Sequence, residues 1–124
     1  MKVVINVRHG GFSLSEAAND MLLDRKGVAY EKRVDPAYSN LIGAEYYSPG
    51  HVGEDAHYLS TRSFTDDRSD ADLVAIVEEL GSAANGDHAE LVIVEIPDDV
   101  KWHIHEYDGM EYIAENHRTW GGEF

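Results

Sequence analysis

The most constraining feature of this sequence is the segment KWHIHEYDGMEYIAE at 101–115. Two runs of strand-forming residues flank Asp108 and Gly109, and an Asp-Gly pair in this position favours a two-residue type I′ turn. Such a turn fixes which residues lie opposite each other, because a shift by one residue would move every side chain to the other face. The segment therefore predicts a C-terminal β-hairpin with a defined register.

The register divides the hairpin side chains between two faces. One face carries Trp102, Ile104 and Ile113, which we expect to pack on the core. Glu106 and Glu111 lie opposite each other, and two adjacent carboxylates suit either an exposed position or one with a cation between them. The second face is polar and aromatic and consists of His103, His105, Tyr107, Met110, Tyr112 and Ala114.

Two segments have the periodicity and the end signals of α-helices. The first helix is expected at about 14–26, with Ser13 as its N-cap, a glutamate three residues later, and Gly27 at its end. The second helix is expected after an N-cap at Ser69 and ends before Gly81. Each helix has an apolar stripe, so we expect both to cover one core.

Three further segments read as strands, at 2–7, 28–34 and 90–96. The segment at about 35–68 contains glycine, proline and several tyrosines, and we expect a long ordered loop there with a short strand or turn. The order of elements predicts an α/β (α+β) fold in which two helices pack on a mixed sheet. A chain of this length forms a single domain, over 1–124.

Charge is the strongest global signal, since 24 acidic residues against 10 Lys and Arg give a formal net charge of −14. Such a surface repels nucleic acid and anionic membranes, so we expect neither as a direct partner. Three explanations remain open: a solvated surface, a halophilic proteome, or a functional face that docks on a basic protein or imitates a nucleic-acid backbone. The candidate acidic residues for that face are Asp66, Asp67, Asp70, Asp72, Glu78 and Glu79.

The chain has no cysteine, which excludes disulfides, thiolate zinc sites, iron–sulfur clusters and a cysteine nucleophile. His103 and His105 share one side of a predicted strand, a spacing that metals use, but no third ligand is fixed nearby. We therefore predict no metal and no cofactor. The first residues lack the pattern of a secretory signal, and we expect a cytoplasmic protein.

The loop before the first helix contains the candidate small-ligand site. Arg8, Gly10, Gly11 and Ser13 could bring backbone N–H groups and a positive charge to a phosphate. The alternative is that the glycines only make a sharp connection from strand to helix. The Arg8-His9-Gly10 order is similar to the nucleophile motif of histidine phosphatases, but that pattern continues with glutamate where this chain has Gly11. We assign no catalytic residue and favour a protein that is not an enzyme.

The segment ENHRTW contains Arg118 and Trp120, residue types that are favoured in binding hot spots. We interpret them either as a recognition tail or as an anchor for the end of the chain.

Three segments together resemble a group of small bacteriophage and prophage proteins: KVVIN…GGFSLSEA, DLVAIVEELG…ANG and VEIPDDVKWHIHEYDGMEYIAENHRTW. The resemblance implies a small accessory protein that acts in an infected or lysogenic bacterium. With the acidic charge, it predicts a non-catalytic inhibitor of a host protein with a basic surface, such as a nucleic-acid-binding defence complex, in the manner of anti-CRISPR and other counter-defence proteins. The alternative is a phosphate- or nucleotide-binding protein, or a minor enzyme, that uses the loop from Arg8 to Ser13.

Overall fold

A computed structural model describes residues 1–33, 45–49, 59 and 61–116. Its order of elements is β1 (Lys2–Asn6), α1 (Glu16–Arg25), β2 (Glu31–Arg33), β3 (Glu45–Tyr47), η2 (Thr61–Phe64), α2 (Ala71–Leu80), η3 (Gly81–Ala84), β4 (Leu91–Glu95), β5 (Trp102–Tyr107) and β6 (Met110–Glu115), where η marks a 3-10 helix. The predicted α+β class, the two helices and the C-terminal hairpin are confirmed. No described helix is long and apolar enough to span a membrane.

The described strands pair in three separate two-stranded antiparallel sheets, β1–β4, β2–β3 and β5–β6, and not in the mixed sheet that the sequence predicted. The reason lies at the outer edge of β1. The Val4 N–H donates to the carbonyl oxygen of Arg68 at 2.9 Å, and the Asn6 N–H donates to Glu111 Oε1 at 2.8 Å. A backbone turn and a side chain thus take the place of a third strand.

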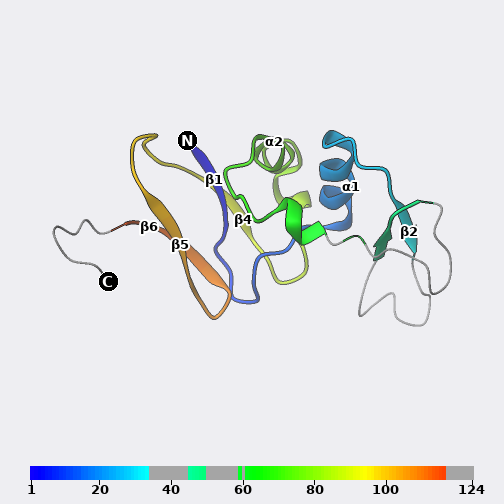
Figure 1. The fold of residues 1–124 in the computed structure, drawn as a ribbon. Helices are drawn as coiled ribbons and strands as arrows, with labels where there is room; N and C mark the ends of the chain where they lie inside the picture. Colours follow the sequence, from blue (N-terminus) through cyan, green and yellow to red (C-terminus); the bar gives the residue numbers. More distant parts are fainter. Residues whose placement is uncertain (34–44, 50–58, 60, 117–124) are drawn as a thin grey trace, which may run out of the picture.

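The three sheets are spread along the molecule. The hairpin lies at one end, β2–β3 lie beside α1 at the other end, and β1, β4 and α2 lie between them (Figure 1). The core forms where α1 and α2 pack on each other and on β1–β4, around fully buried Val4, Leu22, Leu73 and Ile76. Burying one such side chain stabilises the fold by roughly 1.5–3 kcal/mol.

The first helix begins two residues later than predicted, because its N-cap is Ser15 and not Ser13. The Ser15 side chain accepts a hydrogen bond from the N–H of Ala18. Ser13 is held in an extended segment, since its carbonyl accepts from the N–H of Gly86 at 3.0 Å and the next residue forms a β-bridge to Asn85. Contact with a distant loop therefore decides which serine caps the helix.

The second helix is capped by Asp70 and not by the predicted Ser69. The Asp70 carboxylate accepts from the N–H of Leu73 at 3.0 Å, while Ser69 donates its own N–H and O–H groups to Asp67 Oδ1. The helix ends at Gly81, which has a positive φ of 57°, and the chain continues into η3 as expected.

The hairpin has the predicted register, with Tyr107 opposite Met110 and Glu106 opposite Glu111. Asp108 and Gly109 have φ angles of 50° and 85°, the two positive values that a type I′ turn requires. The expected short strand within the irregular segment is β3; most of that segment lies outside the described residues.

Candidate functional site

The loop at 8–13 packs against the hairpin turn and the loop before β4. Gly10 and Gly11 have φ angles of 127° and 94°, and a Cβ on Gly109 would collide with the backbone nitrogens of both. A Cβ on Gly10 would lie 2.7 Å from the Cβ of His88. The glycines are therefore required for close backbone packing, as in the alternative interpretation of this loop.

The anion-binding interpretation of that loop stays a prediction. Ser13 does not contribute to the start of α1, and its hydroxyl donates to the carbonyl oxygen of Asp87 at 3.3 Å. Arg8 is exposed, and its side chain has no partner among the described residues. The loop thus supplies one guanidinium without a described partner, but α1 begins only at Glu16, after the loop has ended.

Asn6 joins the hairpin turn to the central strands. Its side chain is fully buried and makes four hydrogen bonds. The amide nitrogen donates to the carbonyl oxygens of Arg8 and Gly109, both at 2.7 Å, and the amide oxygen accepts from the N–H groups of Glu90 at 2.9 Å and Arg8 at 3.3 Å. The sequence offered no signal for this role beyond a polar residue after an apolar run.

A buried ion pair joins the hairpin to the rest of the molecule. The guanidinium of Arg68 donates to the two Glu111 carboxylate oxygens at 2.7 and 3.0 Å, and the side chains are only 16% and 8% exposed. Arg68 also donates to the carbonyl oxygen of Thr65 and lies 3.6 Å from the ring centre of Phe12. Of the two opposed glutamates, Glu111 is thus buried with a cation and Glu106 is exposed, so both of the predicted alternatives occur. The sequence did not identify Arg68 as the cation.

A pocket of about 440 Å³ opens beside this ion pair. Gly11 and Arg68 line it, together with three carboxylates: Asp66, Glu106 and Glu111. The only guanidinium in the lining is already paired with Glu111. The remaining carboxylates repel phosphate, so this pocket does not favour the anion-binding interpretation.

Cations from other elements neutralise part of the predicted acidic face. Lys26 of α1 lies 2.9 Å from Asp70 and 3.1 Å from Asp72, and Arg25 lies 3.3 Å from Asp72. The hydrogen bond to Asp70 is the main cause that raises the pKa of Lys26. Burial alone would raise the pKa of Asp70, but the hydrogen bonds from Lys26 and from the N–H of Leu73 outweigh it and lower that pKa.

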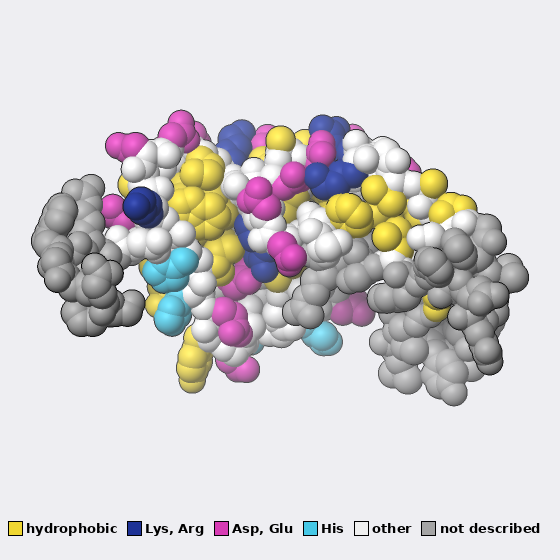
Figure 2. Space-filling model, in the orientation of Figure 1, with side chains coloured by type: hydrophobic (Ala, Val, Ile, Leu, Met, Phe, Trp, Pro, Cys, Tyr) yellow, Lys and Arg dark blue, Asp and Glu magenta, His cyan; other side chains and the backbone are white. Residues whose placement is uncertain are grey.

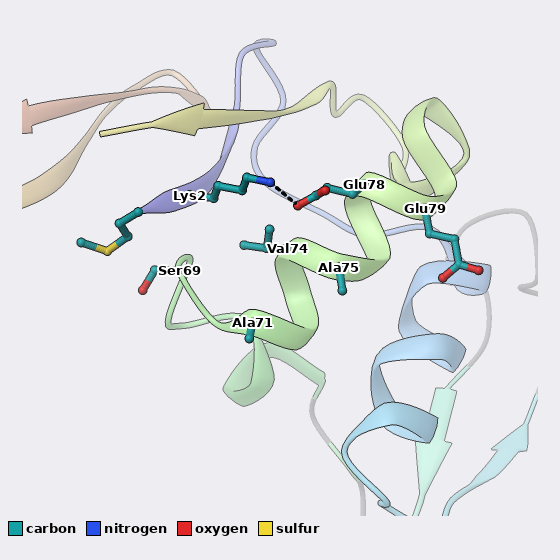
Figure 3. Close-up of a pocket in the computed structure, with 8 residues that line it drawn as sticks. Lys2, Ser69, Ala71, Val74, Ala75, Glu78 and Glu79 are labelled. Carbon is teal, nitrogen blue, oxygen red and sulfur yellow. Dashed lines mark hydrogen bonds and ion pairs between the residues drawn. The ribbon is translucent and has the colours of Figure 1, made fainter. Parts of the chain in front are cut away.

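The far end of α2 is neutralised in the same way. Lys2 pairs with Glu78 at 3.1 Å across a shallow groove of about 690 Å³, in which Ala71 and Ala75 contribute small apolar side chains (Figure 3). Glu79 lines the groove and is exposed, as are Asp66 and Asp67 before the helix. The six predicted acids therefore do not form one free stripe, since cations pair with Asp70, Asp72 and Glu78 but, within the described part of the chain, not with the other three.

The outer face of the hairpin, defined as His103, His105, Tyr107, Met110 and Tyr112, faces solvent. Tyr107, Met110 and Tyr112 are 75%, 37% and 53% exposed, and they are the exposed large hydrophobic residues of the described chain. His105 packs on the Tyr112 ring at a centroid distance of 5.0 Å. Histidine side chains gather over this hairpin in the space-filling view (Figure 2).

The described residues contain no group of three His, Asp or Glu side chains placed to hold a metal ion. The predicted recognition tail, Arg118 and Trp120, lies outside the described residues. Comparison with family models, curated proteins and solved structures found no match.

Proposed function

We propose that this chain is a non-catalytic binding protein that docks on a basic partner through the outer face of the hairpin. One observation carries the proposal: the exposed large apolar side chains of the described chain all lie on that face, in a protein of net charge −14. Tyrosine and methionine are enriched in protein interfaces. Opposite charge speeds the encounter with a basic partner and favours it over acidic competitors.

The partner we propose is a host protein whose basic surface binds nucleic acid. The resemblance to small phage and prophage proteins supports this setting, in the cytoplasm of an infected or lysogenic bacterium, and it supports inhibition of the anti-CRISPR or counter-defence type. Exposed carboxylates in and near the hairpin, such as Glu106 and Asp66, favour such a surface as well. The role as a phosphate-binding protein or minor enzyme is less favoured, because carboxylates line the pocket beside Gly11.

A comparison of two baits tests the proposal. The wild-type chain and the double variant Tyr107→Ser/Tyr112→Ser are used to purify partners from the bacterial host. We expect the wild type to retain a protein with a basic surface and the double variant to lose it, because the apolar anchors are gone. Binding to the purified partner should weaken steeply with ionic strength and compete with nucleic acid.

Tyr30→Ser is the matched control, since Tyr30 packs beside Tyr46, away from the hairpin. This variant should retain the partner. Equal retention by the double variant, or an affinity that is insensitive to salt, would contradict the proposed docking face or its electrostatic basis, respectively.

A further inference from the structure

The outer edge of β5 is an open strand edge. Asn116 N–H donates to the carbonyl oxygen of Lys101 at 2.7 Å, which places odd-numbered β5 residues in the hydrogen-bonded pairs with β6. In an antiparallel pair the alternate residues direct their N–H and C=O groups away from the partner. The outward residues of β5 are therefore Trp102, Ile104 and Glu106.

The outer edge of β1 is covered, whereas that of β5 is not. The carbonyl oxygen of Arg68 and the carboxylate of Glu111 accept from the outward N–H groups of Val4 and Asn6. Within the described chain β5 pairs with β6 alone, and the N–H groups of Ile104 and Glu106 have no partner. An exposed row of such groups is a template for a further strand.

We propose that the outer edge of β5 accepts an extended, Lys- or Arg-rich segment of the partner as an added β-strand. This inference rests on the proposed function and specifies which part of the partner is recognised. Backbone hydrogen bonds to Ile104 and Glu106 supply affinity, and side chains on either side of the edge supply selectivity. His103 and His105 flank the edge on the outer face, and Trp102 and Ile104 flank it on the inner face.

Charge selects the occupant. Exposed Asp99, Glu106 and Asp108 outnumber Lys101 along this edge, and the whole chain carries −14. A second copy of the chain would bring another −14 to the contact, which opposes self-pairing. A basic extended segment has the opposite charge and can make the same backbone hydrogen bonds.

Amide exchange measured by NMR tests the inference on the wild-type chain. In the free protein the amides of Ile104 and Glu106 should exchange at least about tenfold faster than those of His105 and Tyr107, which lie in the hydrogen-bonded pairs. The probe is a short capped peptide of alternating lysine and valine. Its addition should slow the exchange of Ile104 and Glu106 by about tenfold or more and leave the inward amides unchanged.

Two control peptides separate strand addition from plain charge attraction. A lysine–proline peptide has the same positive charge, but its prolines lack the N–H groups that a β-strand needs for hydrogen bonds to its neighbour. A glutamate–valine peptide can form these hydrogen bonds but carries negative charge. Neither should protect the edge. Equal protection by either control peptide would overturn the inference. Protection that rises with protein concentration in the absence of any peptide would indicate self-pairing and would also overturn it.

The same spectra distinguish this inference from the proposed function. One outcome is that the purified basic partner shifts the Tyr107 and Tyr112 resonances without slowing amide exchange at the β5 edge. This result would overturn strand addition and would still support the docking face. Edge protection by the partner that persists in the Tyr107→Ser/Tyr112→Ser variant would support strand addition and contradict the docking face.

Discussion

The helix pair and the hairpin use the same acidic composition in opposite ways. Carboxylates of α1 and α2 are bound by cations within the fold: Asp70 by Lys26, and Glu16 and Asp20 by Lys32. These acids stabilise the helix packing and are not available to a partner. The hairpin instead keeps one charge, that of Glu111, buried near its turn and leaves its aromatic face and one strand edge exposed. Ion pairs thus hold the helix pair together, whereas the hairpin joins the fold near its turn and exposes its outer face.

The largest effect is expected near the turn of the hairpin. Arg68→Ala leaves the buried Glu111 carboxylate without its cation, and removing one partner of a buried pair costs roughly 3–5 kcal/mol. Urea unfolding of the variant measures this loss. The double variant Arg68→Met/Glu111→Leu removes both charges and should be more stable than Arg68→Ala, although the Asn6 N–H then lacks its acceptor. A double variant no more stable than Arg68→Ala would contradict an unpaired buried charge as the main cost.

A smaller loss is expected from Asn6→Leu, which keeps the branching of the side chain and removes four hydrogen bonds. The N–H of Glu90 and the carbonyl oxygen of Gly109 lose this partner, and each buried unsatisfied group costs about 1–3 kcal/mol. We expect a decrease of about 2–3 kcal/mol in the free energy of unfolding. Asn19→Leu, on α1, is the control and should change stability by less than about 0.5 kcal/mol.

On the helix pair the expected effect is smaller again. Asp70→Ala removes both the α2 N-cap and the ion pair to Lys26, and loss of a cap costs about 1 kcal/mol. Asp70→Asn keeps a capping oxygen and removes only the charge. It should therefore lose less stability than Asp70→Ala, and urea unfolding of both variants separates the two contributions.

The lowered pKa of Asp70 fixes the sign of its pH dependence. A carboxyl whose folded pKa lies below its unfolded value of 3.8 adds stability above that value, and the contribution is lost as the pH falls through the folded pKa. The wild type should therefore lose stability on acidification more steeply than Asp70→Asn in this range. Parallel slopes would contradict a stabilising role for this charge.

The sequence predicted what local chemistry decides and missed what distant contacts decide. The Asp108-Gly109 turn specified the hairpin register, because turn conformation and side-chain alternation are local. Each predicted N-cap was wrong by one or two residues, since a neighbouring loop holds Ser13 extended and Ser69 bonds to Asp67. These contacts come from residues that no short pattern contains.

The same limit explains the candidate site. The opposed Glu106 and Glu111 were compatible with an exposed position or with a nearby cation, and only the fold shows that Arg68 binds Glu111. Asn6 gave no signal beyond a polar residue after an apolar run, because its partners Gly109 and Glu90 are brought to it by tertiary packing. The cations beside the predicted acidic face were missed for a similar reason: a spacing along α2 does not reveal that Lys26 and Lys2 approach it from other elements.

The smallest effect on stability is expected at the outer face of the hairpin. Tyr107→Ser/Tyr112→Ser should change the free energy of unfolding by less than about 0.5 kcal/mol, because exposed side chains contribute little to the fold. Urea unfolding of this double variant, measured alongside Arg68→Ala, gives the contrast directly. A loss above about 1 kcal/mol would mean that these tyrosines stabilise the hairpin, which would contradict an outer face that contributes little to the fold.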